Sequence, residues 1–458
     1  MIFDKNAYSV EKLTIGNETL CYRAYRNIIY VEKPVNPEYQ QMNIFVPEAY
    51  YEKKSIHGYT LDTAPVFVPN LVGGYLAGPA AEPAEDKKNP GKPNTVFCSL
   101  LHGYVVAAPA IRGSYQLYGN APASIVDYKA AIRYLHFYAD ELPGDEDRII
   151  TNGTSAGGAI SSLVGATGDH PDYLPYLREI GAADASDTVF AASCYCPITN
   201  LDHADAAYEW EFLGVNQYHG RKAEHVKNGE PIVTFFVKDM TDLQIRISQE
   251  LAAQFPDYVN ALKLRDSEGR SLTLDAKGEG SFKEYVKDVL RCSAQHAVDN
   301  GIDASAKAWL KVSHGVVTDI DFGHYAADIT RMKPAPAFDA ISMDSRENML
   351  FGSGEWEYRH FTAFSSANSL VEGQMAEKQI IKMMNPMNYL EDGQARKAPH
   401  WRIRHGASDR DTSLAISAIL TLKLQELGYD VDYHAPWDTP HSGDYDLEEL
   451  FAWIDGLQ

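Results

Sequence analysis

The stretch Gly153-Thr154-Ser155-Ala156-Gly157-Gly158 has the pattern G-x-S-x-G and decides how the rest of the chain is interpreted. It directly follows RIITNG (148–153), a β-branched run typical of a strand, and it opens a small-residue segment typical of a helix. The turn between such a strand and helix is so tight that its flanking residues must be small. A bare G-x-S-x-G also occurs as a plain glycine-rich turn. The flanking strand and helix favour Ser155 as an exposed nucleophile.

Segments on both sides of this motif alternate strand and helix patterns, which predicts a mostly parallel sheet with helices on both faces. Before and after the motif, strands are predicted at 43–47, 64–70, 104–110 and 188–197, with a helix at 124–142. The alternation stops after Pro197 and resumes near Ala398. From there the pattern predicts a strand at 400–406, a helix at 412–427, a strand at 430–436 and a helix at 446–457.

The interruption between these two parts predicts an insertion. It contains long helical patterns, such as 240–254 and 281–299, and a predicted hairpin around 266–273. The fold class that accommodates an elbow serine, a mostly parallel sheet and such an insertion is the α/β-hydrolase fold. We expect a discontinuous catalytic domain made of 1–196 and 386–458, and a large inserted cap or lid domain made of 197–385.

A further stretch, 78–93, is rich in Pro, Gly and Lys and predicts an exposed loop. Whether this loop covers a functional site or is a plain surface excursion stays open.

The overall composition narrows the class of partner. The chain has 458 residues, 45% of them hydrophobic, and a formal net charge of −22, which argues against a surface that grips nucleic acid. No apolar run approaches the roughly 18 residues that span a bilayer, so no membrane partner is expected. The first residues lack the basic and apolar sections of a secretory signal, which favours a cytoplasmic location. The composition assigns no oligomeric state.

The five cysteines are few and odd in number, which indicates reduced thiols rather than a disulfide framework. Cys194 and Cys196 form a C-x-C pair, but no second Cys/His pair follows at zinc spacing. We therefore expect no metal site and no cofactor.

A serine hydroxyl is a weak nucleophile, so it needs an imidazole that takes its proton and a carboxylate that orients the imidazole. In this fold the chain order is serine, acid, histidine, with both partners on loops that follow late strands. Asp409, in HGASDRDTS, follows the predicted strand 400–406 closely, and His441, in WDTPHSGD, follows the last strand. These positions predict the triad Ser155, Asp409 and His441.

Three other residues, Asp411, His434 and His405, compete with this assignment. Asp411 stands beside Thr412 at the start of a predicted helix, where it would act as a helix cap or a first-turn charge. His434 falls inside the last strand, which predicts a packed sheet histidine. His405 precedes the acid and breaks the chain order.

Acyl transfer also needs N–H donors aimed at the developing oxyanion. The amide that follows the nucleophile, that of Ala156, is the first expected donor. VPNLVGGYLAGP places two glycines just after an early predicted strand, and Gly74 is our candidate for the second donor. Gly73 and Tyr75 remain alternatives, as does a plain turn.

Taken together, five segments resemble the bacterial tannases of intracellular type, which release gallate from galloyl esters. They are TNGTSAGGAISSLVGATGDHPDYLPYL (151–177), CYCPITNLDHADAAYEWEF (194–212), MKPAPAFDA (332–340), HGASDRDTS (405–413) and the loop that carries His441. The resemblance implies the same triad as the chain order. It also implies that Lys333, Glu347 and Asp411 bind the three galloyl hydroxyls; without it, Lys333 and Glu347 would be two ordinary cap charges.

The resemblance implies a serine esterase for galloyl esters, and for depsides as an extension, with a small phenolic ester as its partner. Phenol O–H groups donate to carboxylates and a lysine ammonium donates to phenol oxygens, so such a site should prefer trihydroxybenzoyl groups. A feruloyl or cinnamoyl esterase is the nearest alternative, since it would share the triad. A prolyl-oligopeptidase-type peptidase and a hydrolase-fold binding protein without catalysis are the more distant ones.

Overall fold

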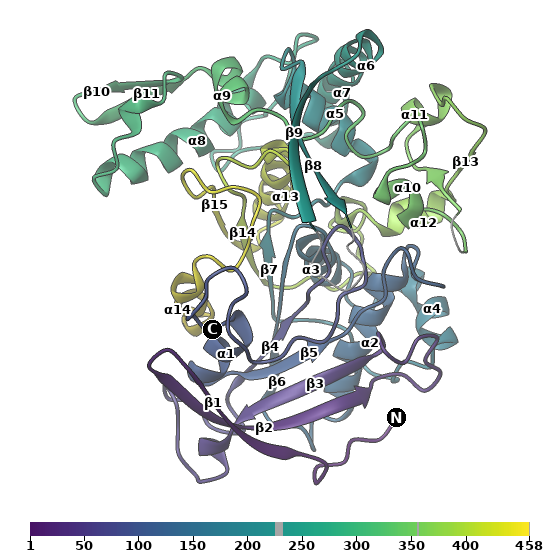
Figure 1. Cartoon of the computed structure of the whole chain (residues 1–458), viewed down its shortest axis with the longest axis vertical. Helices are drawn as coiled ribbons and strands as arrows, with labels where there is room; N and C mark the ends of the chain where they lie inside the picture. Colours follow the sequence, from purple (N-terminus) through teal and green to yellow (C-terminus); the bar gives the residue numbers. More distant parts are fainter. Residues whose placement is uncertain (225–231, 355–356, 458) are drawn as a thin grey trace.

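A nine-stranded sheet forms the centre of the molecule. The computed structural model describes residues 1–224, 232–354 and 357–457. The strand order is β1-β2-β3-β5-β4-β6-β7-β14-β15 (Figure 1), and every pair from β5 to β15 is parallel, whereas β1, β2 and β3 pair antiparallel. The strands are β1 (Ser9–Ile15), β2 (Glu18–Ile29), β3 (Gln41–Pro47), β4 (Pro65–Pro69), β5 (Val105–Pro109), β6 (Asp145–Thr154), β7 (Ala191–Tyr195), β14 (His400–Arg404) and β15 (Asp430–His434).

Helices cover both faces of this sheet. Successive residues of a strand point to opposite faces, and in this sheet both faces carry buried apolar side chains. Val66 and Val68 of β4 belong to the hydrophobic cluster that includes α2, α3 and α13, whereas Phe67 between them packs with Leu450 and Ile454 of α14. The helices that accompany the sheet strands are α1 (Thr95–Leu101), α2 (Ala123–Phe137), α3 (Ala156–Ala166), α4 (Leu174–Glu179), α13 (Leu414–Glu426) and α14 (Leu447–Gly456). The expected α/β-hydrolase architecture, a mostly parallel sheet between two helical layers, is confirmed.

The chain between β7 and β14 builds a separate group of elements at the upper end of the view in Figure 1. It contains α5 (Leu201–Glu211), β8 (Gln217–Glu224), β9 (Ile232–Asp239), α6 (Asp242–Ala252), α7 (Phe255–Leu262), α8 (Ser281–Asp299), β10 (Leu310–Ser313), β11 (Val316–Ile320), α9 (Phe322–Ile329), α10 (Arg346–Leu350), β12 (Arg359–His360), α11 (Ala363–Ala367), β13 (Gln374–Met375) and α12 (Lys378–Met383). Its described strands pair only with one another, as β8–β9, β10–β11 and β12–β13. The domain boundaries 196/197 and 385/386 stay predictions.

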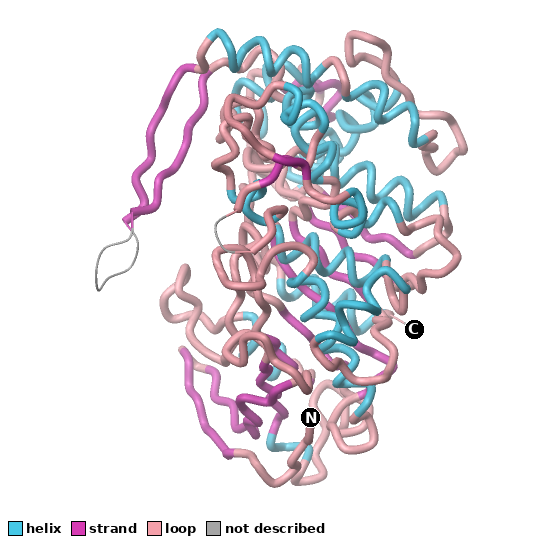
Figure 2. The backbone as a smooth tube through the Cα atoms, turned by 90° about the vertical axis from the view of Figure 1, so that its right-hand side faces the viewer, coloured by secondary structure: helices cyan, strands magenta, loops and turns pink. Residues whose placement is uncertain are grey.

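One part of this group departs from the expected helical character. The antiparallel pair β8–β9, which the sequence did not predict, extends away from the body of the molecule (Figure 2). Short 3-10 helices occur at Glu48–Tyr50, Pro171–Tyr173, Ala304–Ala306 and Pro386–Asn388. Within the described ranges, no helix combines the length and apolar content needed to cross a membrane.

The helix predicted with the most regular apolar spacing agrees best with the structure. The pattern 281–299 matches α8 at both ends, since Phe282, Val286 and Leu290 lie on one buried face four residues apart. The pattern 240–254 ends earlier than predicted, as α6, and the chain restarts as α7. The predicted hairpin 266–273 is a turn with the single bridge Arg265–Ser271 rather than two strands. The stretch 78–93 forms neither a helix nor a strand, as expected of a loop.

Candidate active site

Ser155 occupies the turn between β6 and α3, with φ of 60°, a strained backbone conformation for a residue other than glycine. Its N–H donates to the Tyr195 carbonyl at 2.8 Å, which fixes the turn against the neighbouring strand. A Cβ at Gly153 would lie 2.4 Å from the Asn70 side chain, and one at Gly157 would lie 2.6 Å from it. The two glycines of the motif are therefore required by close packing, as the elbow interpretation predicted.

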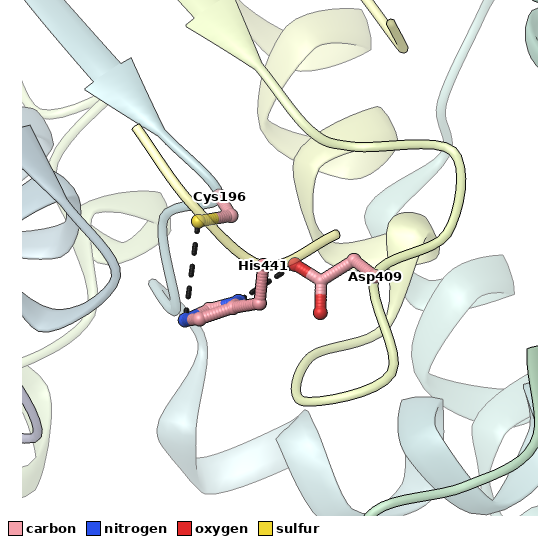
Figure 3. Close-up of side chains that lie close together, drawn as sticks. All are labelled: Cys196, Asp409 and His441. Carbon is pink, nitrogen blue, oxygen red and sulfur yellow. Dashed lines mark hydrogen bonds and ion pairs between the residues drawn. The ribbon is translucent and has the colours of Figure 1, made fainter. Parts of the chain in front are cut away.

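Asp409 and His441 meet above the ends of β14 and β15. The His441 Nδ1–H donates to Asp409 Oδ2 over 2.7 Å (Figure 3). The buried Asp409 carboxylate also accepts the backbone N–H groups of Asp411, at 2.8 Å, and Thr412, at 3.1 Å. These bonds fix the imidazole with its proton on Nδ1 and leave Nε2 to face the rest of the site.

Asp409 and His441 shift each other's pKa toward the charged forms of both side chains. Burial by itself would lower the pKa of His441, but the carboxylate of Asp409 and the neighbouring Cys196 raise it well above its usual value. Burial would raise the pKa of Asp409, yet His441 and His405 hold it well below the usual range. Asp409 is therefore an anion that stabilises a protonated His441.

The loop that carries His441 passes beside the nucleophile turn. A Cβ at Gly443 would lie 1.9 Å from Thr154 Oγ1, so this loop touches the residue before Ser155. Cys196 lies between the two parts of the site: its Sγ is 3.9 Å from His441 Nε2, and a hydrogen bond from the Ser155 backbone lowers the thiol pKa, although burial keeps that pKa raised overall. In the sequence, Cys196 stands out only as part of a C-x-C pair, which does not indicate this position.

The three competitors have other roles. His434 is exposed rather than packed as predicted, because it ends β15 and pairs with Asp432 at 3.0 Å. His405 is buried and bonds Ser417 Oγ at 2.9 Å, with its other nitrogen 3.5 Å from Asp409 Oδ2. Asp411 does not cap α13, because the Ser413 side chain accepts the helix N–H at that position.

Asp411 instead lies between the Lys333 ammonium and the His441 imidazole. Lys333 Nζ lies 2.5 Å from Asp411 Oδ1 and also donates to the Asp411 carbonyl at 2.9 Å. The other carboxylate oxygen of Asp411 is 4.0 Å from His441 Nε2. Burial raises the pKa of Glu347, and the charges of Lys333 and Asp411 act on it in opposite directions. The structure thus brings Lys333, Glu347 and Asp411 into one neighbourhood beside His441.

Helix α5 holds these segments in place through buried polar side chains that the sequence analysis missed. The Tyr208 hydroxyl accepts the N–H of Met332 at 2.9 Å and that of Lys333 at 3.3 Å, and it donates to the Arg410 carbonyl at 2.7 Å. One hydroxyl therefore ties the Lys333 segment to the loop between Asp409 and Asp411.

A buried ion pair supports the same segment from the side. Arg331 and Glu209 are both fully buried, with guanidinium-to-carboxylate hydrogen bonds of 2.5 and 2.7 Å, and Arg331 also donates to the Lys333 carbonyl at 2.6 Å. The sequence signal for this scaffold was the pair of glutamates in YEWE, which alternate with the aromatic residues Tyr208 and Trp210.

Glu211, at the end of the same helix, holds the start of α13. Its carboxyl group accepts Ser413 Oγ–H at 2.6 Å and the Leu414 N–H at 2.9 Å. Burial raises the Glu211 pKa to about 8, so this side chain is a neutral acid at pH 7. A neutral carboxyl group avoids placing a second buried anion near Asp409.

The two candidate oxyanion donors, Ala156 and Gly74, lie at a helix start and in a turn. Ala156 is the first residue of α3, so its N–H has no carbonyl partner within the helix. Gly74 has φ of +55°, and a Cβ there would lie 3.0 Å from the Arg346 guanidinium. The choice of Gly74 over Gly73 or Tyr75 stays a prediction.

The chain is similar to a known protein family and to several solved structures. The BD-FAE family matches residues 75–200. Tannase from Lactobacillus plantarum is 46% identical, with a TM-score of 0.96 over 100% of this chain and 99% of that one. Tannase from Fusobacterium nucleatum is 45% identical, with a TM-score of 0.93 over 99% and 98% of the two chains.

A tannin acyl hydrolase solved in complex with ethyl gallate is 45% identical, with a TM-score of 0.92 over 100% of this chain and 99% of that one. A comparison with curated proteins gives no match. Identity of this extent over nearly the full length of both chains shows more than a shared fold. This chain belongs to the bacterial tannase family of ester hydrolases.

Proposed function

We propose that this chain hydrolyses galloyl esters, including depside bonds, and releases gallate through an acyl-enzyme on Ser155. The observation that carries the proposal is the run of close charges from Lys333 through Asp411 to His441, which places a lysine and a carboxylate beside the imidazole. A relative with 45% identity has been solved in complex with ethyl gallate, which supports the substrate class.

The proposed reaction uses the two nitrogens of His441 differently. Nε2 takes the proton from Ser155 as its oxygen attacks the ester carbonyl, while Nδ1–H stays on Asp409. The negative charge that develops on the carbonyl oxygen is stabilised by the N–H groups of Ala156 and Gly74. His441 then returns the proton to the departing alcohol, and water activated by the same imidazole releases gallate from Ser155.

Substrate choice follows from the charges in the pocket. The three hydroxyls of a galloyl ring would bond Lys333, Glu347 and Asp411, with phenol O–H groups donating to the carboxylates. A ring that lacks the hydroxyls leaves these groups unpaired, which costs about 1–3 kcal/mol for each one that is buried.

The decisive measurement is kcat/KM for methyl gallate, methyl ferulate and methyl benzoate, with Ser155→Ala as the blank. We expect gallate to exceed benzoate by at least about 100-fold. Comparable turnover of ferulate and gallate would leave the triad intact but remove the galloyl pocket, and would favour a feruloyl esterase.

We further propose a cytoplasmic location. The support is that all five cysteines are free thiols, of which Cys21 and Cys292 are exposed, and exposed thiols persist in a reducing compartment. Fractionation of the cells that make this protein, with the activity measured in each fraction, tests the proposal.

A further inference from the structure

The proposed reaction leaves one nucleophilic group of the site without a task. The thiol of Cys196 is fully buried, lies 3.9 Å from His441 Nε2 and 3.5 Å from the Ser442 carbonyl, and takes no part in acyl transfer. Together with a carboxylate oxygen of Asp409, the sulfur and the imidazole place three metal-ligating atoms within 4.8 Å of one another.

The two nitrogens of the His441 imidazole face different groups, so Cys196 and Asp409 would have different roles. Asp409 accepts the hydrogen bond from Nδ1, whereas Cys196 faces Nε2 (Figure 3), so one ion on Nε2 would have the thiol beside it and the carboxylate on the far side of the ring. A metal-bound histidine usually donates its other N–H to a carboxylate in this way. Asp409 would therefore orient the ligand rather than bind the ion.

The distance between sulfur and nitrogen suits a bridging ion. Zinc lies about 2.3 Å from a cysteine sulfur and about 2.0–2.1 Å from a histidine nitrogen, so the two bonds together span about 4.4 Å. The observed 3.9 Å is shorter than this sum, so an ion bonded to both atoms would be bound at a bent angle. A thiolate and an imidazole together favour soft or borderline cations over Mg²⁺ or Ca²⁺.

We propose that Cys196 and His441 form an inhibitory site for a soft divalent cation such as Zn²⁺ or Cd²⁺. Binding replaces the thiol proton, which is released to water, and uses the Nε2 lone pair that would accept the Ser155 proton. The cation and acyl transfer therefore exclude each other. The inhibitory half of the proposal rests on the proposed role of His441, whereas metal binding does not.

The binding test uses the full chain with the two exposed thiols removed, Cys21→Ser and Cys292→Ser, as the parent. Titration with Cd²⁺, followed by the ultraviolet charge-transfer absorbance of a cadmium thiolate, should show one site per chain. Cys196→Ala and Cys196→Ser should each abolish this signal. Cys194→Ala is the matched control, because Cys194 is also buried and lies two residues away but is part of the hydrophobic core, and it should keep the site.

The inhibition test measures the hydrolysis of methyl gallate, and of a simple activated ester such as p-nitrophenyl acetate, over a range of Zn²⁺ concentrations. Each variant is compared with its own metal-free rate. The concentration for half inhibition should rise at least tenfold in both Cys196 variants and stay within twofold in Cys194→Ala.

Two outcomes would overturn the proposal. Cd²⁺ binding or Zn²⁺ inhibition that is unchanged in both Cys196 variants would place the cation elsewhere, and binding that leaves the activity intact would refute the inhibitory role. Failure of the proposed substrate class is distinguishable, because it would remove methyl gallate turnover but not the cadmium signal or the activated-ester rate.

Discussion

The two loops that carry Asp409 and His441 are positioned differently from Lys333 and Glu347, the proposed galloyl-binding residues of the inserted segment, although Asp411 lies beside both groups. Asp409 and His441 follow the adjacent parallel strands β14 and β15, and the carboxyl ends of such strands meet at one edge of the sheet. Lys333 and Glu347 come from the inserted segment, and buried side chains of α5 hold the Lys333 segment in place. Sheet topology alone places the first pair, whereas specific polar contacts place the second.

This contrast predicts two different effects of substitutions on the rate of ester hydrolysis. Changes to the triad loops should lower the rate for every ester, because they act on the chemical step. Changes to the pocket or to its α5 support should lower the rate for gallate much more than for benzoate. The four predictions below test this separation, from the largest expected effect to the smallest.

Asp409→Asn should lower kcat for methyl gallate and methyl benzoate alike, by about 10⁴-fold, because the amide no longer holds His441 with its proton on Nδ1. Since Asp409 raises the His441 pKa, the wild-type kcat/KM should fall on the acid side with an apparent pKa above 6.5, and this limb should move to lower pH in the variant. A pH–rate profile for both esters provides the test. An acid limb that does not move would contradict the assigned pair.

Lys333→Ala should lower kcat/KM for methyl gallate by about 100-fold, since it removes a charged donor and leaves Asp411 without its closest cation. The rate for methyl benzoate should change less than about threefold. Lys311→Ala is the matched control, because that lysine pairs with Asp319 in the exposed part of the inserted segment. Equal losses for both esters would show that Lys333 supports the fold rather than the ring hydroxyls.

Tyr208→Phe should raise KM for methyl gallate by about tenfold, because it removes one hydroxyl that holds both the Lys333 segment and the Arg410 carbonyl. Methyl benzoate should be affected much less. Tyr173→Phe serves as the control: its buried hydroxyl also donates to a backbone carbonyl, that of Met383, away from the pocket. A matching loss of gallate affinity in both variants would attribute the effect to general destabilisation.

Glu211→Gln should leave the activity at pH 7 nearly unchanged and alter only stability. The folded-state pKa of about 8 lies above the usual value near 4.5, so the neutral acid contributes stability that is fully present below about pH 4.5 and is lost as the pH rises from there through about 8. The amide of a glutamine does not ionise, so the variant does not lose this stability at high pH. Thermal unfolding should therefore show a higher Tm for the variant at pH 9, by about 2 °C, and no advantage at pH 5. A difference that is the same at both pH values would contradict a protonated Glu211.

Sequence patterns predicted the parts of the molecule that depend on local rules. The glycines around Ser155 indicated the elbow because its tight turn excludes side chains at Gly153 and Gly157. Apolar residues at helical spacing gave α8 its bounds, and short runs of β-branched or aromatic residues predicted most sheet strands. The pair β8–β9 was missed because a projecting hairpin buries few side chains and so lacks a strong apolar pattern.

For the active site, the order of serine, acid and histidine along the chain was enough to select Asp409 and His441, which the structure places 2.7 Å apart. Lys333, Glu347 and Asp411 were assigned to substrate binding only through the family resemblance, because Lys333 and Glu347 are isolated charges in a long insertion and Asp411 resembles an ordinary charge at a helix start. Tertiary structure alone decided that the Tyr208 hydroxyl meets an amide 124 positions away and that Cys196 faces His441. Turn chemistry and periodicity act between near neighbours in the chain, whereas these contacts depend on how separate segments pack.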